Sequence, residues 1–140
     1  MVNLQSLTQQ TYLIMGFFKS ISKSSSGIDD HEFWNPMESE EDLLKAIENS
    51  NLHRVIIFKH STRCPISKIV MKSFENQINN ADEDYEYWYL DLLRHRELSN
   101  KIAEDFEVTH QSPQIIVLEK EKAIFDASHQ AIDLDEVKQL

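Results

Sequence analysis

The sequence predicts an α/β fold in which helices flank a central mixed sheet of four strands. Residues 55–58, Val-Ile-Ile-Phe, form a short and wholly apolar run, which is typical of a strand buried on both faces. Apolar side chains at helical spacing follow from Pro65, and a second strand-like and helix-like pair occupies residues 85–106. With 140 residues, 41% of them hydrophobic, the chain can bury the core of one such domain.

Residues 1–32 are expected to form a flexible extension, and the folded domain is expected to span residues 33–140. The stretch 20–30 is rich in serine and has no aromatic side chain, so it has too little to bury. A short apolar patch before it lacks the flanks of a signal peptide and is too short to span a bilayer. An internal start at Met15 would make residues 1–14 a mis-annotated start.

The first helix is predicted to begin after Ser39 and to end near Ser50. Ser39 is a typical N-cap, Asp42 lies three positions later, and leucine and isoleucine follow at amphipathic spacing. The next element is the central strand, residues 55–58, whose C-terminal end leads into the polar segment 59–64. No chemistry is expected on this first helix.

The second helix is predicted to start at Pro65, because proline is favoured at the first helical position. Apolar residues then continue at helical spacing, namely Ile66, Ile69, Val70, Phe74 and Ile78. Cys64 therefore precedes the helix directly.

The second half of the chain repeats the order of strand and helix and then ends in a hairpin. Residues 85–92 are rich in tyrosine and tryptophan, as strands are, and residues 96–106 have the apolar spacing of a helix. Residues 115–118 and 123–125 are short apolar runs on either side of a polar break without glycine, which predicts antiparallel neighbours. A short helix is predicted at residues 134–140.

Cys64 is the only cysteine of the chain, so no internal disulfide can form, and a reducing cytoplasm is the expected location. At a helix N-terminus the free backbone N–H groups and the helix dipole stabilise a thiolate. Four basic residues and no acidic one lie between residues 55 and 74, namely Lys59, Arg63, Lys68 and Lys72. The local charge therefore supports a thiolate site rather than a buried structural cysteine.

The whole chain has the opposite charge, with 14 basic and 24 acidic residues and a net charge of −10. Such a surface repels nucleic acid and anionic lipid. Neither is an expected partner.

Three further residues leave alternatives open. His60 is either a general base or metal ligand beside Cys64, although two ligands are too few for a closed zinc site, or a plain polar residue at a strand end. Ser67 either donates a hydrogen bond to the sulfur from the same helix face or is a helix-surface residue. Pro113 marks either the first residue of a strand or a cis peptide bond.

Two separated segments resemble the thioredoxin superfamily: Cys64-Pro65-Ile66-Ser67 after an apolar strand, and Ser112-Pro113 before another. In this resemblance Ser67 occupies the place of the second cysteine. Three longer motifs, residues 58–67, 110–114 and 127–129, are similar to the YtxJ-like monothiol bacilliredoxins, and the similarity covers about residues 33 to 133. The resemblance implies a thioredoxin-like fold.

The resemblance also implies an activity, which is removal of bacillithiol from mixed disulfides on cytoplasmic client proteins. Cys64 would attack the mixed disulfide and take up bacillithiol, and a second thiol would release it. The expected catalytic residues are Cys64, Ser67 and a cis Pro113 beside the cysteine. The expected substrate-binding residues are Lys59, Thr62, Arg63, Pro65 and Ser112, the last through its backbone.

Bacillithiol would be a co-substrate, and no cofactor or bound metal is expected of this monomeric enzyme. Carboxylates of the thiol would meet Lys59, Arg63 or Lys68 through charge-assisted hydrogen bonds. Two other functions remain open. One is an iron–sulfur module with the cluster held between two subunits, and the other is a redox-inactive adaptor that kept the fold.

Overall fold

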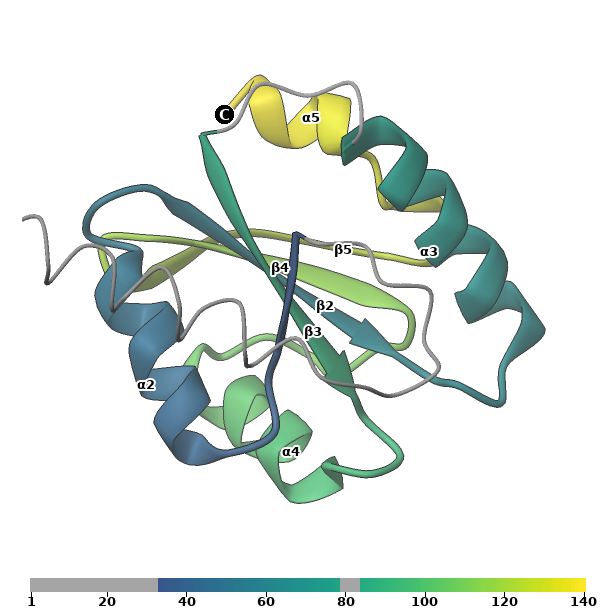
Figure 1. Ribbon diagram of the computed structural model, residues 1–140, viewed down its shortest axis with the longest axis horizontal. Helices are drawn as coiled ribbons and strands as arrows, with labels where there is room; N and C mark the ends of the chain where they lie inside the picture. The colour runs from purple at the N-terminus through teal and green to yellow at the C-terminus, as the bar shows by residue number, and fades with distance from the viewer. Residues whose placement is uncertain (1–32, 79–83) are drawn as a thin grey trace, which may run out of the picture. The chain divides into compact units, whose positions relative to one another are not determined.

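The computed structural model describes residues 33–78 and 84–140 as helices on both faces of a mixed sheet (Figure 1). The elements are β1 (Trp34–Pro36), α2 (Glu40–Asn49), β2 (Arg54–His60), α3 (Pro65–Ile78), β3 (Tyr85–Asp91), α4 (Arg96–Asp105), β4 (Gln114–Glu119), β5 (Lys122–Ser128), a 3-10 turn (His129–Ala131) and α5 (Leu134–Lys138). The α/β class and the order of the predicted elements are confirmed. The expected N-terminal extension and internal start lie outside the described residues.

The sheet has five strands in the order β1-β3-β2-β4-β5, so the prediction of four strands is wrong. The additional strand, β1, covers only three residues and pairs in parallel with β3, Trp34 opposite Tyr87. It is too short to show the alternation that reveals a strand in a sequence. Its proline is tolerated because β1 lies at the sheet edge, where one backbone N–H needs no partner.

Strand β2 lies at the centre of the sheet, between β3 and β4. It runs parallel to β3, with His60 opposite Asp91, and antiparallel to β4, with Lys59 opposite Gln114. The predicted hairpin of β4 and β5 is confirmed as an antiparallel pair. The C-terminal end of β2 therefore lies next to the start of β4.

Two separate hydrophobic cores cover the two faces of the sheet. Helices α2 and α4 pack on one face and α3 and α5 on the other (Figure 1). Successive β2 residues face opposite cores, since Ile57 belongs to the α2–α4 core and Phe58 to the α3–α5 core. None of the helices in the described ranges is long and apolar enough to cross a membrane.

Specific hydrogen bonds fix the start of α2 and the β4–β5 turn. Ser39 and Asp42 form a complete capping box at the start of α2, as the sequence predicts. The β4–β5 turn contains Lys120 and Glu121, whose φ angles of 51° and 66° are positive without glycine. Ser50 holds this turn, because its carbonyl accepts from Lys120 N and its hydroxyl from Glu121 N, both at 2.8 Å.

Candidate functional site

The candidate site lies where β2 ends and α3 begins. The Cys64 N–H donates to the Ser61 carbonyl at 3.1 Å, and the Cys64 carbonyl accepts from Lys68 N at 3.1 Å. Cys64 is therefore held in the turn that opens a 14-residue helix, and its thiol side chain is half-buried. A thiolate at this position faces the unpaired N–H groups and positive dipole end of α3.

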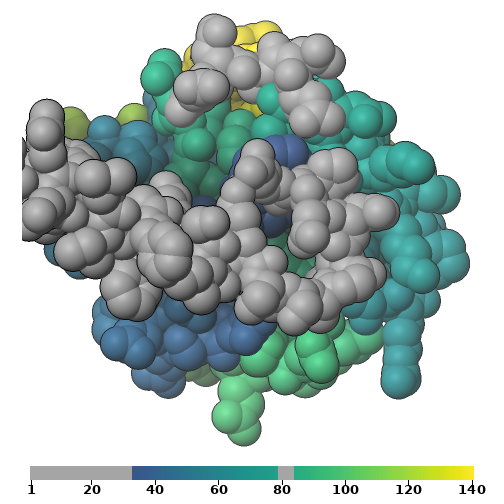
Figure 2. Space-filling view, in the orientation of Figure 1, coloured from purple at the N-terminus to yellow at the C-terminus, as the bar shows by residue number. Residues whose placement is uncertain are grey.

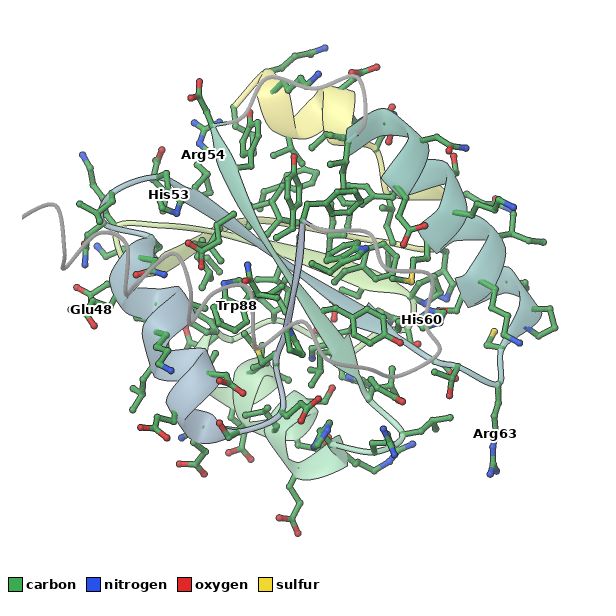
Figure 3. The ribbon with its side chains drawn as sticks, viewed as in Figure 1. Glu48, His53, Arg54, His60, Arg63 and Trp88 are labelled. Atoms are coloured by element: carbon green, nitrogen blue, oxygen red, sulfur yellow. The ribbon has the colours of Figure 1, made fainter. Side chains whose placement is uncertain are left out.

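The residues around Cys64 are exposed. Thr62, Arg63 and Pro65 all reach the surface, and Figure 3 shows the Arg63 side chain extending away from the β2–α3 turn. Ile66 and Ile69 on α3 expose 55% and 69% of their surface. Helix α3 lies along one side of the molecule in the space-filling view (Figure 2). The thiol thus borders an accessible surface that is both apolar and basic.

His60 and Ser67 lie beneath this surface and bind each other. Their exposed fractions are 5% and 0%, so the surface alternative for Ser67 is wrong, whereas His60 is a polar residue at the end of β2 that is buried. His60 Nδ1 lies 2.7 Å from Ser67 Oγ, and Ser67 Oγ also accepts from Ser61 N at 3.1 Å. The Ser67 hydroxyl is thus committed to His60 rather than to the sulfur.

The surroundings of His60 favour its neutral form. Burial lowers the pKa of His60, and Lys68 lowers it further, against the opposing effect of the Asp91 carboxylate. The ring packs near Phe58 and Tyr89, with centroids at 6.4 and 5.7 Å.

Lys59 points to the other face of β2 and is fully buried, with no exposed surface. Its ammonium donates to the Ser99 carbonyl of α4 at 3.0 Å and lies 3.4 Å from His110 Nδ1. Burial lowers the pKa of Lys59 to about 8. The expectation that Lys59 meets carboxylates of a thiol substrate is therefore corrected, because its ammonium is enclosed between β2, α4 and the segment before β4.

The peptide bond between Ser112 and Pro113 is cis, which resolves the alternative left by the sequence. Strand pairing of Lys59 with Gln114 puts Pro113 beside the end of β2. The Pro113 carbonyl accepts from His129 N at 3.0 Å. Pro113 is buried, whereas Ser112 is half-buried, and its hydroxyl has no hydrogen-bond partner among residues 33–78 and 84–140.

Gln114, whose role the sequence did not indicate, holds the segment that leads to Pro113. It is fully buried, its Nε2 donates to the Thr109 carbonyl at 2.9 Å, and its Oε1 accepts from Gln111 N at 3.3 Å. His129 was likewise missed as the partner of Pro113. Both belong to motifs that carry the resemblance, which was the only signal available for them.

Within the described residues no group of three or more His, Cys, Asp and Glu side chains is placed to hold a metal ion. The site has one thiol at a helix N-terminus, with a hydroxyl at Ser67 three positions along the chain, and the strand that leads to it ends beside the cis-proline.

Solved structures with a thioredoxin fold are similar to the fold of this chain. One, a protein with a thioredoxin fold and a suggested oxidoreductase role, is 25% identical with a TM-score of 0.69, covering 81% of this chain and 97% of its own. Thioredoxin from Fasciola hepatica is 15% identical with a TM-score of 0.60, over 75% and 94% of the two chains. Mitochondrial thioredoxin 3 from Saccharomyces cerevisiae is 19% identical with a TM-score of 0.57, over 75% and 91%. Fold and site together define a thiol redox protein of the thioredoxin-fold class.

The family is more specific. The family model described as monothiol bacilliredoxin BrxC matches residues 35–137. The chain therefore belongs to the monothiol bacilliredoxin family, and the resemblance noted in its three motifs is confirmed.

Proposed function

We propose that this protein removes bacillithiol from mixed disulfides on cytoplasmic client proteins by thiol–disulfide exchange at Cys64. The observation that carries the proposal is a single half-buried thiol at the N-terminus of α3, in a chain of the monothiol bacilliredoxin family. Ser67, in the place of a second cysteine, offers no thiol to complete an internal disulfide. An external thiol must therefore finish each cycle.

The cycle has two exchange steps. The Cys64 thiolate attacks the bacillithiol sulfur of the client mixed disulfide, the client thiolate leaves and takes a proton from solvent, and a Cys64–bacillithiol disulfide forms. A second bacillithiol, as its thiolate, then attacks the bacillithiol sulfur on Cys64. This restores the Cys64 thiolate and forms bacillithiol disulfide. Over the cycle the client mixed disulfide is reduced by two electrons and bacillithiol is oxidised, without a cofactor.

The surface around Cys64 suits these substrates. Arg63 and Lys68 are exposed on either side of the thiol and can form charge-assisted hydrogen bonds with carboxylates of bacillithiol. Thr62, Pro65 and the backbone of Ser112 complete the proposed contact area. Exposed Ile66 and Ile69 add apolar surface for a client protein.

The test uses a bacillithiolated protein of known mass, incubated with wild-type protein or with the Cys64→Ser variant. The wild type is expected to remove bacillithiol from the client and to gain its mass on Cys64, as read by intact mass spectrometry. The variant is expected to do neither. A wild-type protein that leaves the client modified and gains no mass overturns the proposal, and a brown protein with visible charge-transfer absorption would favour the iron–sulfur module instead.

A further inference from the structure

His60 and Ser67 form a buried polar pair that the exchange reaction itself does not require. They come from β2 and α3, their hydrogen bond measures 2.7 Å, and both side chains are nearly or fully inaccessible to solvent. Figure 3 shows His60 turned inward between the sheet and α3. Buried polar pairs are costly unless their protons and lone pairs are matched, so the proton positions of this pair can be worked out.

The hydrogen-bond pattern assigns those protons. Ser67 Oγ already accepts from Ser61 N–H, and burial favours the neutral ring of His60. The arrangement that gives the hydroxyl proton the stronger acceptor has Ser67 donating to an unprotonated Nδ1, with the ring proton on Nε2. With the ring proton on Nδ1 instead, the hydroxyl would have to turn to the Cys64 sulfur, which is a weak acceptor as a thiol.

Further hydrogen bonds connect this pair through Ser61 to the backbone of Cys64. Ser67 Oγ holds Ser61 N, and the Ser61 carbonyl holds Cys64 N. Cys64 directly precedes α3 and Ser67 is the third residue of the helix, so their side chains lie at the same helix end. A Ser67 hydroxyl proton that His60 does not take has the Cys64 sulfur as its acceptor at this end.

We propose that His60 is a positioning residue that acts on Cys64 through Ser67. The neutral ring keeps the Ser67 hydroxyl proton turned away from the sulfur. When the ring is protonated, Nδ1–H becomes a donor to Ser67 Oγ, and the hydroxyl turns to the Cys64 thiolate. His60 thereby sets how much of Cys64 is ionised, and with it the exchange rate, so this inference deepens the proposed function and rests on it.

The charged groups around His60 are compatible with such a switch. Asp91 at the end of β3 favours the protonated ring and Lys68 on α3 opposes it. Tyr89 also faces the ring, and burial raises the pKa of Tyr89 to about 12, so its phenol stays neutral over the working range.

The experiment measures the midpoint of the Cys64 thiolate titration, from thiolate absorbance or from the pH dependence of iodoacetamide alkylation. Because Cys64 is the only cysteine, the signal has one source. His60→Leu and His60→Asn form a matched pair of similar shape, of which only asparagine keeps an acceptor near the Nδ1 position. His60→Leu is expected to lower the midpoint by about one unit, a tenfold rise in the thiolate-to-thiol ratio, whereas His60→Asn should leave it unchanged.

A double-mutant cycle separates this route from a packing effect. In a Ser67→Ala background, His60→Leu is expected to produce no further shift, because the hydroxyl that transmits the effect is absent. Equal shifts from His60→Leu and His60→Asn, or a His60→Leu shift that persists without Ser67, would overturn the inference.

A second measurement does not disturb the buried histidine. The His60 titration is followed by NMR in full-length wild type and in Ser67→Ala, each before and after carbamidomethylation of Cys64. Coupling is reciprocal, so blocking the thiol is expected to lower the His60 midpoint more in wild type than in Ser67→Ala. Equal changes in both proteins contradict the inference. No step involves a disulfide, so its failure and that of the proposed function are distinguishable.

Discussion

At the scale of single residues, the end of β2 places two basic side chains on opposite faces of the sheet. His60 reaches Ser67 on α3, and Lys59 reaches Ser99 on α4 and His110 before the cis-proline. Each therefore connects the strand to a different part of the site. Both side chains are almost completely inaccessible to solvent, so neither can bind substrate directly.

The buried Lys59 predicts a rise in stability with pH. Burial lowers its pKa from the ordinary value of 10.5 to about 8 in the folded protein, so above pH 8 the unfolded chain holds more protons. The free energy of unfolding then increases with pH. The stabilisation is present above the unfolded pKa and is lost as pH falls through the folded pKa. We expect a gain of about 1 kcal/mol between about pH 8 and about pH 9.5.

Urea unfolding across this interval measures the gain. The Cys64→Ser background leaves no thiol to titrate. Tyr87 and Tyr89 oppose the gain only toward the upper end of the interval, where phenols of the unfolded chain begin to ionise, because burial raises the pKa of each in the folded protein from 10.0 to about 12. Lys59→Met in that background is expected to flatten the dependence. An equal slope with and without Lys59 would show that another group is responsible.

At the scale of elements, the β4–β5 turn has backbone angles that are unfavourable for the residues it contains. Lys120 and Glu121 both have positive φ, as in the two-residue hairpin turns that prefer Asn-Gly, and each such residue costs about 1 kcal/mol. The double variant Lys120→Asn, Glu121→Gly is expected to raise the free energy of unfolding by about 1 kcal/mol. Ser50 still accepts both backbone N–H groups.

Urea denaturation of wild type and variant measures this change. Lys122→Asn, in strand β5 next to the turn, is the control, because it alters a neighbouring exposed side chain without supplying a residue suited to positive φ. A turn variant no more stable than wild type would mean that the bonds from Ser50 already offset the backbone cost.

The elements also show what a sequence can predict. The strands and helices with apolar patterns, such as β2 and α3, were predicted because burial imposes a period on their residues. The edge strand β1 has no such period. The burial of Lys59 and Ser67 was missed because their partners lie on separate elements, and sequence order does not indicate which polar side chains will meet. Cys64 and Pro113 were identified as candidate site residues because a lone cysteine before a helix and a proline before a strand are informative without knowledge of the fold.

At the scale of the whole molecule, the charge around Cys64 is opposite to the net charge of −10. Burial of Lys59 leaves Arg63, Lys68 and Lys72 as the exposed cations of this segment. Charges act over about 10 Å at 0.1 M salt, so a cation adjacent to Cys64 in the chain, such as Arg63, acts on the thiol more strongly than distant acidic residues do. The site is thereby expected to attract small anionic thiols that the rest of the surface repels.

Alkylation of Cys64 by anionic iodoacetate and by neutral iodoacetamide measures this local potential, since the ratio of the two rates cancels thiol ionisation. Arg63→Gln is expected to lower the ratio of iodoacetate to iodoacetamide rate by about two- to fivefold at low salt, and high salt should reduce the difference. Lys45→Gln on α2, an exposed residue whose helix packs on the opposite face of the sheet from α3, removes the same charge and should leave the ratio unchanged. If both variants lower the ratio equally, net charge rather than the placement of Arg63 controls access to the thiol.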